Sequence, residues 1–257
     1  MQVDRGVAVV TGGSSGIGAA IARMLVRRGR RCVLLARGEE RLQAVAAELG
    51  AEYEVCDVGD RMQVEKVAAR ILERHPRIDV LVCSAGIPGR RRFLDAEPER
   101  IEELTRVNYL GTVWSVRAFL PGLEAAVPSD VVTIVSVAGL VAFPASGPYS
   151  AAKHAQVAFS RSIAVELRPR GIRVHTVSPG FVETEGFPQR GVLEMPVLGR
   201  LVVGPERVAA DVERVLRRDR SESVVPRWYR VAPLAQALVP GIVHRALRRG
   251  GYRRADA

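Results

Sequence analysis

The chain has 257 residues, with 38 lysine and arginine side chains against 28 acidic ones, a formal charge of +10 and 47% hydrophobic residues. This length and hydrophobic fraction exclude an intrinsically disordered chain and suit one α/β domain. Three cysteines are too few for a disulfide framework and favour a reducing compartment, in which we expect them to be buried thiols.

Short runs of apolar, β-branched residues alternate with helical periodicity from residue 7 to about residue 226. The predicted strands are Val7–Val10, Cys32–Leu35, Tyr53–Cys56, Ile78–Cys83, Val131–Ser136 and Ile172–Ser178. The predicted helices cover residues 17–25, 42–49, 64–72, about 99–124 and about 149–168. Apolar strands separated by amphipathic helices are typical of a parallel sheet covered on both faces. The pattern therefore predicts a single-domain, Rossmann-like doubly wound α/β fold.

The positive charge is carried almost wholly by arginine, because Lys66 and Lys153 are the only lysines. No aromatic residues interleave with the arginines in a basic stripe, so we expect no nucleic-acid partner. The few residues before Val7 leave no room for a signal peptide, and prolines and glycines interrupt the longest uncharged stretch, residues 131–152. We expect a cytoplasmic protein without a membrane span.

A glycine-rich stretch, Thr11-Gly12-Gly13-Ser14-Ser15-Gly16-Ile17-Gly18, lies between the first predicted strand and the first predicted helix. Glycines let the backbone approach a diphosphate, and the N–H groups of a helix N-terminus stabilise its charge. A tight turn would also use glycine, but this position in the chain favours a dinucleotide site. We predict that the cofactor contacts Gly12, Ser14, Ser15, Gly16, Ile17 and Gly18.

The residue that follows the second strand discriminates between dinucleotides in such a site. A carboxylate there would bind the ribose 2′-hydroxyl, but this chain has Ala36 followed by Arg37. A guanidinium can form a charge-assisted bond to a 2′-phosphate, worth about 1.5–3 kcal/mol. The sequence favours NADP(H) over NAD(H), and NAD(H) stays the alternative because Arg37 can also be one more surface arginine.

The segment Tyr149-Ser150-Ala151-Ala152-Lys153 places a phenol and an ammonium group on one face of a predicted helix. A neighbouring cation lowers the pKa of a phenol from its usual value of about 10, so the pair can act as an acid or base. Ser136 ends a predicted strand, where its hydroxyl can bind a substrate carbonyl or cap the strand. Asn108 lies inside a predicted helix, where we expect it to kink the helix and hold a water, or to be structural.

Together with Asp57, Ala85-Gly86 and Pro179-Gly180, these residues resemble the short-chain dehydrogenase/reductase family over about residues 7–226. The resemblance implies a proton donor or acceptor at Tyr149, a lysine at Lys153 that lowers its pKa and holds the nicotinamide ribose, and a carbonyl-orienting Ser136. It implies that Asn108 positions a water and that Asp57 meets the adenine. It implies further cofactor contacts by Val58, Ser84, Ala85, Gly86, Tyr149, Lys153, Pro179, Gly180, Val182 and Thr184. Cys83-Ser84 replaces the usual Asn-Asn, from which we expect altered loop stability rather than lost chemistry.

These features predict an NADP(H)-dependent oxidoreductase, a ketoreductase that moves hydride between nicotinamide and a carbonyl or secondary alcohol carbon without a metal. The alternatives are a cofactor-binding sensor or scaffold with little turnover and an NAD-dependent alcohol dehydrogenase. The stretch 181–204 is apolar, with Phe187, Val192, Leu193, Met195, Pro196, Val197 and Leu198. It predicts a lid over a lipophilic substrate, or a loop that simply folds over the domain. The resemblance also implies a homodimer or homotetramer.

We divide the chain into a catalytic domain, residues 1–226, and a basic amphipathic extension of the same domain, residues 227–257. Residues 227–255 hold seven arginines and no acid, and an apolar stripe runs through residues 231–249. Pro240-Gly241 should kink or divide this helix. The stripe can pack on the core or on another subunit; the alternative is peripheral contact with the inner membrane face, because basic amphipathic helices bind anionic lipid.

Overall fold

The computed structural model describes residues 6–89, 91–186 and 202–249, apart from the side chains of His244 and residues 246–249. In this part of the chain, seven strands pair in parallel in the order β3-β2-β1-β4-β5-β6-β7. The strands are β1 Val7–Thr11, β2 Arg31–Ala36, β3 Glu52–Val55, β4 Val80–Cys83, β5 Ser129–Ile134, β6 Ile172–Pro179 and β7 Glu222–Val225. The predicted single-domain, Rossmann-like doubly wound sheet is confirmed.

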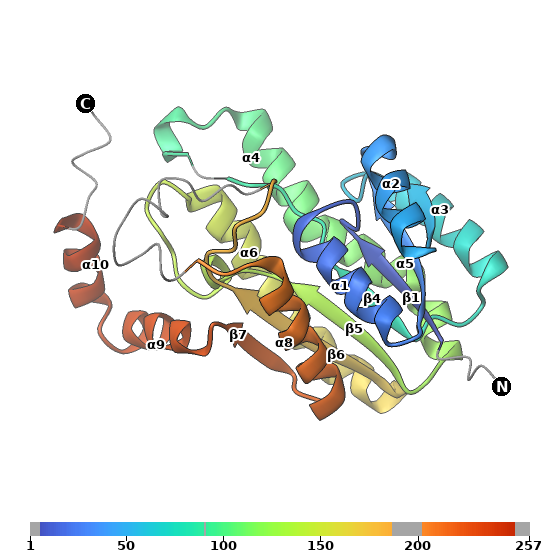
Figure 1. Cartoon of the computed structure of the whole chain (residues 1–257). Helices are drawn as coiled ribbons and strands as arrows, with labels where there is room; N and C mark the ends of the chain where they lie inside the picture. The colour runs from blue at the N-terminus through green and yellow to red at the C-terminus, as the bar shows by residue number, and fades with distance from the viewer. Residues whose placement is uncertain (1–5, 90, 187–201, 250–257) are drawn as a thin grey trace.

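Helices cover both faces of this sheet (Figure 1). They are α1 Gly16–Arg27, α2 Glu39–Leu49, α3 Arg61–Arg74, α4 Pro98–Thr105, α5 Gly111–Ala125, α6 Gly147–Leu167, α8 Pro205–Arg218, α9 Val231–Leu238 and α10 Pro240–Arg249. Helices α1 and α8 lie on one side of the sheet, and α5 and α6 lie on the other. From β1 the chain adds β2 and β3 on one side of the sheet and then β4 to β7 on the other side. A crevice is expected at this change of direction, beyond the carboxyl ends of β1 and β4.

The alternation of side chains along β1 shows why this sheet needs helices on both faces. Val7 and Val9 pack into the core on the side of α3, α5 and α6, whereas Ala8 and Val10 pack into the core beneath α1, α2 and α8. All five residues of β1 are buried. The three cysteines are buried free thiols, as predicted.

The predicted elements differ from the structure in three places. The long helix expected over residues 99–124 is interrupted by a π-helical turn, Arg106–Leu110, between α4 and α5. Strand β5 ends at Ile134, so Ser136 lies beyond the strand, at the start of the short helix Val137–Gly139. Helix α8 and strand β7 were not assigned from the sequence.

The C-terminal extension forms two helices, α9 and α10, divided at Val239, as the Pro240-Gly241 pair predicted. Helix α9 follows β7 through the short helix Arg227–Arg230. Within the described residues, no helix combines the length and the apolar character needed to cross a bilayer.

Candidate active site

The glycine-rich turn after β1 can form only because three of its positions lack a side chain. Gly12 and Gly16 have φ values of 70° and 52°, in the left-handed region that favours glycine. A Cβ on Gly12 would lie 2.9 Å from the backbone of Ala85, and a Cβ on Gly18 would lie 2.1 Å from the carbonyl oxygen of Gly12. The turn therefore brings the N-terminus of α1 close to the segment after β4. The first turn of α1 carries no acidic side chain to compete for its N–H groups.

This turn forms one wall of a cleft of about 470 Å³ at the carboxyl ends of β1, β2 and β4. Of the cofactor residues expected from the sequence, the cleft is lined by Gly12, Ser14, Ser15, Gly16, Ile17, Gly18, Arg37, Asp57, Val58, Ser84, Ala85, Gly86 and Thr184. Five others are not among its lining residues: Tyr149, Lys153, Pro179, Gly180 and Val182. Because this wall is rich in glycine and includes the first residues of α1, whose N–H groups can bind a diphosphate, the residues present fit an extended dinucleotide.

The cleft also contains a second arginine that the sequence analysis missed. Arg41 lies in the first turn of α2 and lines the cleft with Arg37. Arg37 Nη1 is 3.8 Å from both Asp57 Oδ2 and Glu103 Oε1, and Arg41 Nη2 is 2.8 Å from Glu185 Oε1. Both guanidinium groups are half-exposed, so this end of the cleft can offer two cations to an anionic group.

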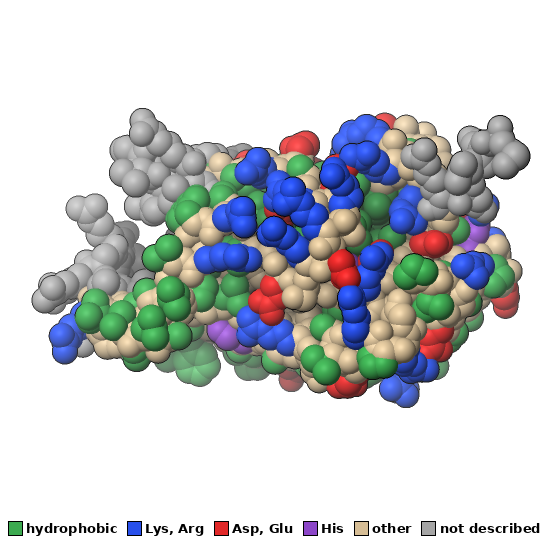
Figure 2. Space-filling view, turned by 90° about the horizontal axis from the view of Figure 1, so that it is seen from below, with side chains coloured by type: hydrophobic (Ala, Val, Ile, Leu, Met, Phe, Trp, Pro, Cys, Tyr) green, Lys and Arg blue, Asp and Glu red, His purple; other side chains and the backbone are tan. Residues whose placement is uncertain are grey.

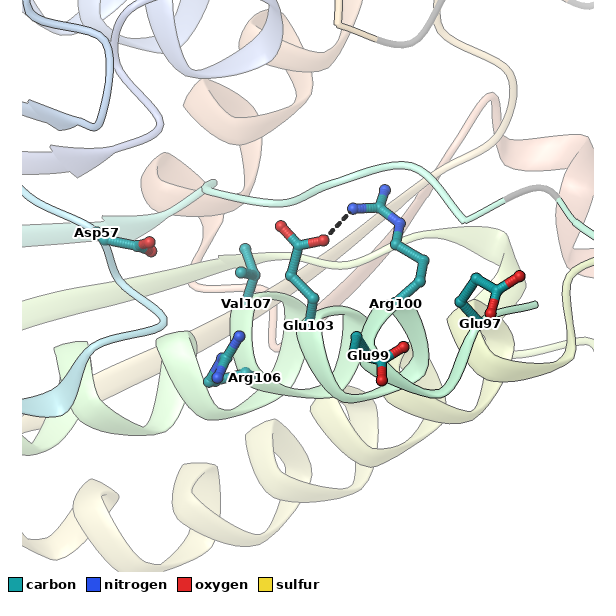
Figure 3. Close-up of a pocket in the computed structure, with 7 residues that line it drawn as sticks. All are labelled: Asp57, Glu97, Glu99, Arg100, Glu103, Arg106 and Val107. Atoms are coloured by element: carbon teal, nitrogen blue, oxygen red, sulfur yellow. Dashed lines mark hydrogen bonds and ion pairs between the residues drawn. The ribbon is translucent and has the colours of Figure 1, made fainter.

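An acidic cavity of about 490 Å³ adjoins this end of the cleft and shares Asp57 and Val107 with it. Its lining residues are Asp57, Glu97, Glu99, Arg100, Glu103, Arg106 and Val107 (Figure 3). Figure 3 shows Arg100 and Glu103 pointing toward each other, and the two form an ion pair. Four carboxylates against two guanidinium groups disfavour an anion in this cavity. A phosphate is therefore better placed beside Arg37 and Arg41.

The start of the segment after β4 is held by the hydroxyl group of Thr11. Thr11 Oγ1 accepts hydrogen bonds from the N–H groups of Ser84 and Ala85, at 3.1 and 3.2 Å. The same hydroxyl lies 3.4 Å from the carbonyl oxygen of Val82 and donates to it. At this point Cys83-Ser84 departs from the family pattern, and we expected altered loop stability there. The structure shows Thr11 anchoring the two backbone amides.

Asn108 lies in the π-helical turn and is fully buried. Its Oδ1 accepts from the N–H of Ile87 at 3.0 Å, and its Nδ2 donates to the carbonyl oxygen of Ile87 at 3.1 Å. The helix is distorted at Asn108, as expected, but its side-chain amide fixes the segment after β4.

Gly86 connects the cleft to the predicted catalytic side chains. A Cβ at this position would lie 2.8 Å from Asn108 Oδ1 and 3.7 Å from Lys153 Nζ. Lys153 lies one turn after Tyr149 on α6, and its Nζ is 5.9 Å from the centre of the Tyr149 ring. The Ser136 hydroxyl is hydrogen-bonded to the phenol of Tyr149, and its oxygen also accepts from Ala138 N at 3.1 Å. The four predicted catalytic residues thus meet where the cleft ends.

Burial dominates the electrostatics of this cluster. It raises the pKa of Tyr149 to about 12, although the hydrogen bond with Ser136 acts in the opposite direction. It lowers the pKa of Lys153 to about 7. The expectation that Lys153 lowers the phenol pKa in the protein alone is therefore wrong. Helical spacing identified the neighbouring amine, but the loss of hydration on burial is the largest cause of both pKa shifts.

The family model for short chain dehydrogenases matches residues 6–191. The chain belongs to this family. The family consists of oxidoreductases with a nicotinamide cofactor, and the matched region includes the cleft and the four residues that meet beside Gly86. Within the described residues, no group of three His, Cys, Asp or Glu side chains is arranged to hold a metal ion.

Three curated relatives match different shares of the chain. The chain is 37% identical over 188 residues to a putative ketoacyl reductase of Streptomyces coelicolor, covering 70% of this chain and 72% of the relative. It is 33% identical over 210 residues to carbonyl reductase family member 4 of Xenopus tropicalis, covering 80% and 89%. The match spans a smaller share, 61%, of dehydrogenase/reductase SDR family member 7B of Danio rerio.

Two solved structures share the fold over most of the chain. A Burkholderia cenocepacia enzyme in complex with NADP has a TM-score of 0.81 and 27% identity, covering 96% of this chain and 99% of that one. An alcohol dehydrogenase from Thermococcus sibiricus, complexed with 5-hydroxy-NADP, has a TM-score of 0.77 and 31% identity, covering 87% and 97%.

The structure does not test one predicted part of the site, and it adds one residue that was not predicted. Residues 187–201, which include the apolar residues of the predicted lid, lie outside the described residues. Gln156, which contacts Lys153, is a residue of the site that the sequence analysis missed. The signal was a polar side chain three residues after Lys153, on the face of α6 that the pattern predicts to be buried.

Proposed function

We propose that the chain is an NADP(H)-dependent ketoreductase that interconverts a hydrophobic ketone and its secondary alcohol. The observation that carries this proposal is the cluster of Ser136, Tyr149 and Lys153, in which Lys153 lies beside Gly86 at the end of a cleft that fits a dinucleotide. When bound, NADPH supplies the hydride to the carbonyl carbon.

The chain's residues account for the proton in this proposal. The hydroxyl groups of Ser136 and Tyr149 hold the carbonyl oxygen as negative charge develops on it. The O–H bond of Tyr149 breaks as the proton passes to that oxygen, which becomes the alcohol hydroxyl. The resulting phenolate is stabilised by the Lys153 ammonium and is reprotonated from water. With a pKa of about 12, Tyr149 is almost wholly protonated at neutral pH, which suits the direction of reduction.

The choice of NADP(H) rests on charge at the end of the cleft near β2. Arg37 and Arg41 line this end, and neither Ala36 nor Gly38 provides a carboxylate to repel a 2′-phosphate. The two solved relatives described above are complexed with NADP or a derivative of it. An NAD-dependent alcohol dehydrogenase remains the alternative because Asp57 and Glu103 already pair with Arg37.

A carbonyl substrate is supported by the names of two relatives, a putative ketoacyl reductase and a carbonyl reductase family member. The test is to mix the purified protein with NADPH and a panel of hydrophobic ketones and follow the loss of cofactor absorbance. We expect turnover with some of these ketones and a weaker rate with NADH. Tight NADPH binding without turnover of any ketone would favour the sensor or scaffold.

The surface of the C-terminal extension suggests where the substrate comes from. Its exposed apolar side chains are Trp228, Val231, Leu234, Leu238, Val239 and Ile242. Arg227, Arg230 and Arg245 are exposed beside them, and residues 227–249 contain no acid. Figure 2 shows hydrophobic side chains gathered at the end of the molecule that carries α9, with arginines nearby. Helix α9 also touches the loop between Ser136 and Tyr149, because the N–H of Ala142 donates to Gln236 Oε1 at 3.2 Å.

This surface fits the interface of an anionic bilayer better than a second copy of the chain. In a two-fold contact the same surface would meet itself, and residues 227–249 would supply no acidic partner for their arginines, whereas anionic lipid headgroups neutralise them. Tryptophan and leucine beside arginine are typical of helices that lie in the membrane interface. We therefore include peripheral contact with the inner membrane face in the proposal, for a protein kept in the cytoplasm. A homodimer or homotetramer, which the family resemblance implies, would form through other surfaces.

A further inference from the structure

A buried amide lies directly behind the ammonium group of Lys153. Gln156 is three residues further along α6 and is 0% exposed, and Lys153 is 3% exposed. Lys153 Nζ donates to Gln156 Oε1 at 2.8 Å and to the carbonyl oxygen of Ile134 at 3.4 Å. Two of the three N–H bonds of the ammonium group are thus directed into the protein, which leaves the third for the side of Tyr149 and Gly86.

The orientation of the Gln156 amide is fixed by the hydrogen bonds of its nitrogen atom. Gln156 Nε2 donates to Thr112 Oγ1 at 2.8 Å and to the carbonyl oxygen of Ile134 at 3.5 Å. An amide nitrogen can only donate, so a flipped amide would place N–H groups against the Lys153 ammonium. The oxygen must therefore face Lys153.

The network ties Lys153 to three elements of the domain. Thr112 belongs to α5, Ile134 ends β5, and Gln156 belongs to α6. Because all these groups are buried, each loses water when the chain folds and needs its protein partner. A hydrocarbon side chain at position 156 would leave the ammonium group with the longer bond to Ile134 as its remaining contact in this network.

We propose that Gln156 is a positioning residue that directs the Lys153 ammonium group toward Tyr149 and the cleft. Its role in catalysis rests on the proposed reductase function, whereas its effect on Lys153 does not. Gln156 acts through Lys153 and does not itself touch substrate or cofactor.

The composition of the chain allows a direct test, because Lys153 and Lys66 are its only lysines. Labelling lysine with ¹³C at Cε gives two NMR signals, and Lys66 is an exposed internal reference. The pH titration of each signal is then measured in the full-length protein and its variants. Tyr149 is the ionisable side chain beside Lys153, so the same titrations are repeated in a Tyr149→Phe background.

Gln156→Met removes the acceptor and keeps the side-chain length, so the Lys153 titration should move down by about one pH unit. Gln156→Glu keeps an acceptor and adds a negative charge, so the Lys153 titration should move up by about one pH unit or more. Ser160→Ala is the matched control, because Ser160 is buried on α6 and bonds the backbone of Gln156 without touching Lys153. We expect no shift in this variant, and none for Lys66 in any variant.

Kinetics then separate the positioning role from the proposed function. Gln156→Met should lower kcat for ketone reduction by about tenfold, with a smaller change in the KM of the ketone. An unchanged Lys153 titration in folded Gln156→Met would overturn the proposal. If Gln156→Met does not fold, an unchanged Lys153 titration in Gln156→Glu would overturn it. A shifted titration with unchanged kcat would overturn it too. Shifted titrations in a protein that reduces no ketone would instead reject the reductase function and leave the geometry of Lys153 intact.

Discussion

Lys153 Nζ lies 5.9 Å from the centre of the Tyr149 ring, on the same face of α6 and next to the end of the dinucleotide cleft. This relationship makes the phenol the proton donor of the proposed reaction. It also places a buried cation where the domain has little water to stabilise it.

The first prediction concerns the stability cost of Lys153. Burial lowers its pKa from 10.5 to about 7, so between these values the unfolded chain binds more protons than the folded one. Between these pH values, the contribution of Lys153 to the free energy of unfolding therefore rises with pH, by up to about 1.4 kcal/mol per pH unit. We expect Lys153→Met to increase the free energy of unfolding more at pH 7 than at pH 9, as measured by urea denaturation. An equal effect at both pH values would contradict a lowered pKa for the buried Lys153.

The second prediction concerns the two arginines of the cleft. Arg37→Ala should weaken NADPH binding by about 10- to 100-fold, because a charge-assisted bond to the 2′-phosphate is lost. NADH binding should change little. Arg41→Ala should act in the same direction, and Arg161→Ala, which breaks an exposed pair with Glu222, is the matched control. Fluorescence titration measures each affinity, and equal losses for the two cofactors would refute the NADP(H) assignment.

How much the sequence predicted depends on how local each signal is. The glycines at 12, 16 and 18 and the Tyr149-Lys153 pair were recognised because their spacing is contained in a few residues. Gln156 was missed because its partners Thr112 and Ile134 are 44 and 22 residues away. Arg41 was missed because only the packing of α2 places it at the cleft. The direction of the Tyr149 pKa was predicted wrongly because spacing does not report burial.

The third prediction is a difference in pH dependence between the two directions of the reaction. Oxidation of the alcohol needs the phenolate of Tyr149, whose pKa is about 12. Its kcat/KM should therefore rise by up to tenfold per pH unit from pH 7 to 10. Reduction uses the protonated phenol, so ionisation of Tyr149 should not lower kcat/KM for ketone reduction between pH 7 and 10. An oxidation rate that levels off near pH 7 would show that Tyr149 is far more acidic than burial implies.

The fourth prediction concerns the C-terminal extension. The intact chain should sediment with anionic vesicles more strongly than with neutral ones, and salt should weaken this binding. The double variant Leu234→Gln and Leu238→Gln should lose most of it, because both side chains are exposed and apolar. Val165→Gln, which replaces an exposed apolar side chain on α6, is the control. Unchanged sedimentation of the double variant, or of a chain without residues 228–257, would show that the extension is not a membrane contact.

The role of Tyr149 as proton donor is tested by ketone reduction with Tyr149→Phe, with NADPH affinity determined on the same preparation. We expect a loss of about 10²- to 10⁴-fold in kcat, because the proton donor is gone, and nearly unchanged NADPH affinity. Turnover close to that of the unaltered chain would contradict this role of Tyr149.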